Sequence, residues 1–161
     1  MELASLSHLL AALLALGLLY AAYTDWRRRQ IDNWLNAVIA LAAPLFWFAC
    51  GLGLADIGWQ FALALGSFVL LAGLFAMGAM GGGDVKLLTA LALWIKPMLF
   101  LQLVTIMAVA GGVLTIGFAF WHIARRNRHR IAIPYGLAIA FGGLWVLAAN
   151  YLPFAAGHPL G

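Results

Sequence analysis

The sequence predicts an all-α polytopic membrane protein, a bundle of six transmembrane helices of which the fourth is short. Three observations support this fold class. Hydrophobic residues make up 66% of the chain and charged residues only 9%, whereas a soluble domain carries about 25% charged residues. Long apolar runs alternate with short polar or glycine-containing connections. The basic residues gather in every second connection. At 161 residues, we expect one membrane domain over residues 1–161 without a separate soluble module.

The predicted segments are 3–24, 34–53, 58–79, 85–95, 97–122 and 132–152. Most of them approach the ~20 residues needed to cross ~30 Å of hydrocarbon. The first segment has only Glu2 as an early charge and is followed by three arginines, which favours a transmembrane helix over a cleaved leader. The fourth segment is the exception, because its residues rise only about 18 Å as an α-helix.

The basic residues predict the orientation of the bundle. If all six segments cross, eight of the nine basic residues lie on one side, and only Lys96 lies opposite. The eight are Arg27, Arg28, Arg29, Lys86, Arg125, Arg126, Arg128 and Arg130. Cytoplasmic loops carry an excess of Lys and Arg, so we expect this side to be the cytoplasm and both termini to lie outside. The same agreement favours a complete crossing by the fourth segment.

Asp25 and Asp84 are the strongest candidates for chemistry. An ionisable group at a membrane segment is costly and indicates function. Alone, Asp84 could be a helix N-cap, and Asp25 could be a polar boundary residue beside the arginines. Two helix crossings, however, bring both to the same side of the bundle. We therefore expect the two carboxyl groups to meet in a shallow cavity that faces the cytoplasm.

The residues around these aspartates have weaker signals. Gly81, Gly82 and Gly83 precede Asp84; without a Cβ they permit positive φ and close approach of an extended substrate. Lys86 either favours ionisation of Asp84 or reaches lipid phosphates. Asp32 is interpreted first as the N-cap of the second segment. Six internal glycines are expected to allow close helix packing: Gly66, Gly73, Gly111, Gly112, Gly142 and Gly143.

Metal and nucleic-acid chemistry find no support in the sequence. Cys50 is the single cysteine, which excludes an internal disulfide and a cysteine-based zinc site. Four scattered histidines, His8, His122, His129 and His158, lack metal-ligand spacing. We expect no metal, no cofactor and no nucleic-acid partner.

Three motifs, in order along most of the chain, resemble those of the prepilin peptidases. Residues 23–35 (Tyr-Thr-Asp, basic residues, then Ile-Asp-Asn-Trp-Leu) resemble the first motif of that family. Residues 81–88 match its GxGD motif and the Lys-Leu-Leu continuation, and residues 131–136 resemble the Pro-aromatic-Gly opening of its last helix. The chain departs from the family at Asp32, where a proline is usual; this leaves a third carboxyl group nearby.

The resemblance implies an aspartic endopeptidase of the inner membrane that removes short basic leaders from pilin-like precursors on the cytoplasmic side. Asp25 and Asp84 match the two catalytic aspartates of the family. The small size resembles the short members that serve Flp-type tight-adherence pili. Larger relatives carry an additional cytoplasmic domain with cysteine pairs and methylate the new N-terminus, so methyltransferase activity is not expected here.

Two other classes of function are compatible with membrane aspartates. A proton- or ion-coupled transporter would use them as a relay, although no internal repeat is evident and both lie near one edge. A structural membrane subunit of a secretion complex would need neither. For a peptidase, the two carboxyl groups would share one proton, and the sequence leaves open which of them is the base.

Overall fold

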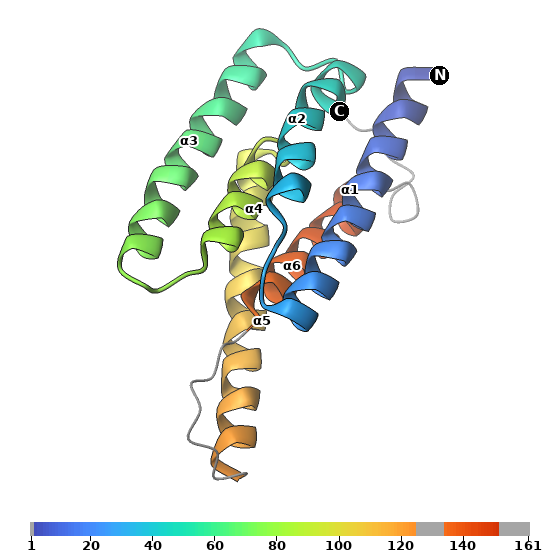
Figure 1. Ribbon diagram of the computed structural model, residues 1–161. Coiled ribbons are helices and arrows are strands. Elements are labelled where there is room, and N and C mark those ends of the chain that lie inside the picture. Colours follow the sequence, from blue (N-terminus) through green and yellow to red (C-terminus); the bar gives the residue numbers. More distant parts are fainter. Residues whose placement is uncertain (1, 125–133, 152–161) are drawn as a thin grey trace.

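The computed structural model describes residues 2–124 and 134–151. These residues form six α-helices (Figure 1). The helices are α1 (Glu2–Arg28), α2 (Asn33–Ala49), α3 (Leu54–Ala76), α4 (Gly82–Ala92), α5 (Pro97–Ala124) and α6 (Tyr135–Asn150). The all-helical prediction is therefore confirmed, and the fourth helix is the shortest, with 11 residues.

Long apolar helices indicate an integral membrane protein. Three helices are long and apolar enough to cross a bilayer: Leu3–Arg28, Leu54–Ala76 and Pro97–Phe120. The helices α2 and α6 are apolar but shorter. Six complete crossings therefore remain a prediction, whereas a membrane location follows from the long spans alone.

Successive helices run in alternating directions (Figure 1). As a result, the end of α1, the start of α2, the end of α3 and the start of α4 lie toward the same end of the bundle, and the last turns of α5 project beyond them. The helix α6 packs against α5 and α1, while α4 contacts both α2 and α3. Segments far apart in the sequence are thus brought together at one end of the bundle.

The centre of the bundle is built around α4. Leu87, Leu88 and Leu91 have no solvent exposure. Just after the helix, the indole of Trp94 stacks on Phe46 with ring centroids 4.8 Å apart. Its Nε1 donates to the Ile39 carbonyl at 2.8 Å. Large apolar side chains on the outer helices are exposed instead, as expected where lipid covers the surface.

Several predicted helix boundaries were wrong by a few residues. The helix α1 continues to Arg28, so Asp25 lies inside its last turns rather than after its end. The helix α4 begins at Gly82, which places Asp84 in its first turn, and Gly81 occupies the N-cap position. The N-cap interpretation of Asp84 is therefore wrong. The six segments themselves are all present as helices.

The predicted packing glycines divide into two groups. A Cβ at Gly142 would lie 2.8 Å from the Leu103 carbonyl oxygen, and one at Gly143 would lie 2.8 Å from a Leu18 methyl group. Gly111 similarly approaches the Tyr135 ring. Close packing is confirmed at these three positions. At Gly66, Gly73 and Gly112 a Cβ would meet no atom within 4 Å, so the packing prediction is wrong there.

Candidate active site

A cavity of about 410 Å³ opens where the connection between α1 and α2 approaches the start of α4. Its walls are residues 29–33 and 81–83, together with the side chains of Asp25 and Asp84. Two acidic residues from distant parts of the sequence therefore line one cavity. Both side chains are largely buried, which is unusual for carboxyl groups without a function.

Asp25 is held by a contact with α6, a helix that is far from it in the sequence. Its Oδ2 accepts a hydrogen bond from the backbone N–H of Gly136 at 2.8 Å, at the start of α6. The guanidinium of Arg29 also acts on this carboxylate electrostatically. The backbone of Arg29 has φ +55°, a left-handed conformation common where helices end. This conformation ends α1 one turn after Asp25 and directs the chain along the cavity wall.

Asp84 is the third residue of α4. A carboxylate in the first helical turn interacts favourably with the positive end of the helix dipole. A Cβ at Gly81 would lie 2.8 Å from Asp84 Oδ2, so the carboxylate occupies the space that a side chain at residue 81 would take. The Asp25 carboxylate also repels that of Asp84. A second carboxylate nearby disfavours the ionisation of a carboxyl group.

The glycine run before Asp84 allows close contacts within the protein. A Cβ on Gly83 would lie 3.2 Å from Ile31 Cβ, and one on Gly82 would lie 3.3 Å from the Phe75 ring. The start of α4 can therefore contact the α1–α2 connection directly. The freedom to adopt positive φ is not used in this run, because the described glycines with positive φ are Gly51 and Gly78.

Lys86 has a different partner from the one considered in the sequence. Its Nζ donates to Asn33 Oδ1 at 2.8 Å, which joins the first turn of α4 to the first turn of α2. Asn33 is one of the residues that line the cavity. The structure therefore gives Lys86 a contact with a residue of the cavity wall.

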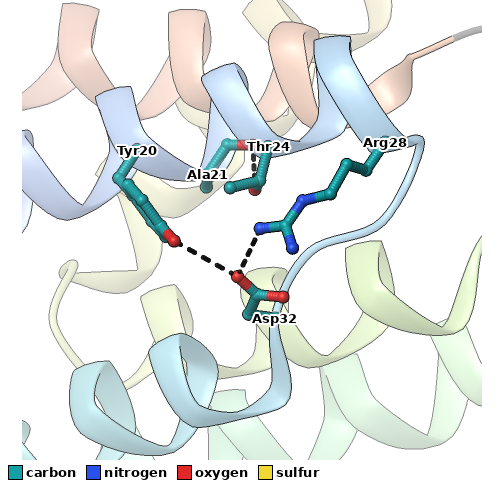
Figure 2. A network of polar contacts seen from close by, with 5 residues as sticks. All are labelled: Tyr20, Ala21, Thr24, Arg28 and Asp32. Atoms are coloured by element: carbon teal, nitrogen blue, oxygen red, sulfur yellow. Dashed lines mark hydrogen bonds and ion pairs between the residues drawn. The ribbon is translucent and has the colours of Figure 1, made fainter.

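Asp32 occupies the N-cap position of α2, but its side chain makes no cap hydrogen bond in the described part of the chain. Instead, Asp32 Oδ2 pairs with Arg28 Nη2 at 3.0 Å and accepts from the Tyr20 hydroxyl at 3.4 Å (Figure 2). Figure 2 shows both partners reaching from α1 toward Asp32. The prediction that Asp32 occupies the N-cap position of α2 is thus correct, but the expected hydrogen bond from its side chain to the helix start is not made.

A protein-family model matches this chain. The model of the type IV leader peptidase family covers residues 12–116. The chain belongs to this family. It is accordingly an aspartic prepilin peptidase by family, and the matched range contains both cavity aspartates. This assignment replaces the transporter and structural-subunit hypotheses. No curated protein and no solved structure matches the chain.

Sequence reasoning missed one residue of this leader peptidase. The Pro-aromatic-Gly motif contains Gly136, but the motif does not predict its contact with Asp25. The match to the family model ends before α6, so the contact is known from the structure alone. The available signal was a glycine two residues after a helix-starting proline, a position where an N–H is free to bind an anion.

Proposed function

We propose that this leader peptidase cleaves the short basic leader from Flp-type pilin precursors, with Asp25 and Asp84 as its catalytic pair. The observation that carries this proposal is the placement of two buried carboxyl groups, from α1 and α4, in the wall of one cavity. The family membership gives the reaction class. The four-residue connection between α1 and α2 and the single cysteine of the sequence support peptidase activity without methylation.

The mechanism uses one ionised and one protonated aspartate. The ionised member takes a proton from water as the water oxygen bonds to the scissile carbonyl carbon, and the protonated member gives its proton to the carbonyl oxygen. The resulting diol then breaks its C–N bond. The first aspartate returns its proton to the amine nitrogen, and a diol hydroxyl restores the proton of the second. The pair thereby ends in its starting state.

The substrate must be extended where it is cut, because a helix holds its carbonyl groups in internal hydrogen bonds. The cavity of about 410 Å³ matches the size of sites that hold small ligands or a few residues. Polar residues of the α1–α2 connection line part of its wall. An extended junction between leader and pilin helix fits such a cavity better than an intact helix.

The orientation of the enzyme is also a proposal. Arg27, Arg28, Arg29 and Lys86 lie toward the cavity end of the bundle, and Lys96 follows α4 at its other end. This distribution supports a cytoplasmic cavity. The arginines at 125, 126, 128 and 130 belong to the same prediction but lie outside the described residues.

The direct test is cleavage of a purified Flp-type precursor in proteoliposomes that contain this protein. We expect a shortened pilin whose new N-terminus, read by sequencing, begins immediately after the basic leader. A precursor with its leader lysines and arginines replaced by serine serves as the matched control for leader recognition. An intact precursor under conditions where a known leader peptidase cleaves it would contradict the proposal.

Asp32 is expected to contribute to recognition of the basic leader. It is accessible beside the cavity and paired with Arg28, and a leader cation could exchange for that arginine. Exposed charge pairs are worth about 0.2–1 kcal/mol. Asp32→Asn should therefore raise KM by up to about fivefold and leave kcat unchanged. Asp56→Asn, at the start of α3, is the control; equal KM values for both variants would remove this role.

A further inference from the structure

The start of α6 donates a hydrogen bond to Asp25, one of the two cavity aspartates. Gly136 is the second residue of α6, and its N–H donates to Asp25 Oδ2 at 2.8 Å in a buried position. The first N–H groups of a helix have no partner within it and carry a partial positive charge. The Asp25 carboxylate thus accepts a hydrogen bond from one of these N–H groups at the start of α6.

The contact also requires glycine at this position. A Cβ on residue 136 would lie 2.8 Å from Asp25 Oδ2 and 2.9 Å from its Cβ and Cγ. Carbon atoms of real side chains do not approach so closely, and the neighbours are buried and cannot retreat freely. An alanine would therefore push the Asp25 carboxylate away from the N–H. The fold thus tolerates only glycine if Asp25 is to stay where it is.

The surroundings of the two aspartates differ in charge. Asp25 faces amides of α6, at Gly136 and Leu137, and the guanidinium of Arg29 from the connection that follows α1. Asp84 faces the Gly81 amide and the Asp25 carboxylate itself. Donors and cations favour the charged form of a carboxyl group, whereas the repulsion between the two carboxylates acts equally on both and favours neither. When the pair holds one proton, the negative charge is therefore favoured on Asp25.

We propose that the Gly136 amide positions Asp25 as the ionised, proton-accepting member of the pair and leaves Asp84 as the proton donor. The proposal rests on the proposed function and assigns the two roles left open there. Water would give its proton to Asp25 while Asp84 gives its own to the scissile carbonyl oxygen. Gly136 touches no substrate; it acts as a positioning residue through Asp25.

The first test compares Gly136→Ala with Gly112→Ala, a helical glycine where a Cβ meets nothing within 4 Å. A displacement of reacting groups by about 1 Å can cost about 10²-fold in rate. We expect Gly136→Ala to lower kcat about 100-fold with KM unchanged, because residue 136 does not line the cavity. The acid limb of its pH–rate profile should move to higher pH, since the ionised base has lost a donor. Gly112→Ala should match the wild type.

The second test separates the roles without altering the packing. Asparagine has nearly the shape of aspartate, and at residue 84 its amide can still donate a hydrogen bond to the carbonyl oxygen. At residue 25 it cannot accept a proton from water. We expect Asp84→Asn to retain at least about tenfold more activity than Asp25→Asn. This comparison decides the matter even if Gly136→Ala is not inserted into the membrane.

The outcomes distinguish this inference from the proposed function. If both asparagine variants cleave like the wild type, the aspartate mechanism itself fails. If both are impaired but Asp25→Asn is the more active, the role assignment is overturned and the peptidase mechanism stands. A Gly136→Ala enzyme that is correctly inserted and has wild-type kcat and pH profile would equally overturn the positioning role.

Discussion

Replacing Asp25 or Asp84 by asparagine is expected to reduce the rate of leader cleavage by about 10²–10⁴-fold, the contribution of a positioned acid or base. The two side chains line the same cavity and act on one proton, so their effects should not add. The double variant is expected to be about as slow as the slower single variant. Measurement of initial rates on a pilin precursor in proteoliposomes gives all three values.

Asp56→Asn is the matched control for these variants. Asp56 lies in the first turn of α3, where its carboxylate accepts the Gly53 N–H at 3.3 Å, remote from the cavity. Its cleavage rate should equal that of the wild type. Equal amounts of inserted protein and similar thermal unfolding midpoints would show that the catalytic variants fold. Wild-type rates in both single variants would exclude the aspartate pair as the catalytic groups.

Trp94→Ala is expected to have the largest effect on stability. The indole is 4% exposed, stacks on Phe46 and donates to the Ile39 carbonyl on α2. Removing a buried aromatic side chain costs about 3–5 kcal/mol in lost contacts and a residual cavity. The free energy of unfolding in detergent should fall by that amount, with a matching decrease in the thermal midpoint.

Two variants show which part of Trp94 is responsible. Trp94→Phe keeps a stacked ring but loses the indole N–H, so we expect a smaller loss that reflects an unpaired carbonyl, about 1–3 kcal/mol. Trp59→Ala removes a tryptophan that is 68% exposed on α3 and should change the unfolding free energy little. A Trp94→Ala protein as stable as Trp59→Ala would refute the central role given to this side chain.

The sequence was sufficient to predict the six helices and the placement of the two aspartates in one cavity. Apolar runs of about 20 residues have few alternatives to helix in lipid, and alternating helices place residues 25 and 84 at one end by connectivity alone. Boundaries were less predictable. At α4, the glycines at positions 82 and 83 favour a loop by propensity, yet both belong to the helix, where Phe75 and Ile31 lie close beside them.

Contacts between segments far apart in the sequence could not be predicted from it. The bond from Gly136 to Asp25 joins residues on α6 and α1, and no periodicity in either segment encodes their register. Lys86 illustrates the same limit. Asp84 is close to it in the sequence, but Lys86 binds Asn33 instead, because of the way α2 and α4 pack. The three glycines with open surroundings were misjudged for the same reason: the sequence does not show which helix face meets a neighbour.

The short helix α4 is held at both of its ends. Near one end Lys86 Nζ donates to Asn33 Oδ1 at 2.8 Å, and at the other Trp47 Nε1 donates to the Leu93 carbonyl at 2.7 Å. Its 11 residues rise about 16 Å, well short of the hydrocarbon thickness. The long outer helices can tilt when lipid chains lengthen or shorten, whereas α4 has no free end to follow them. The position of Asp84 therefore depends on the packing of α4 against α2 and α3 and not on a match between the length of α4 and the thickness of the bilayer.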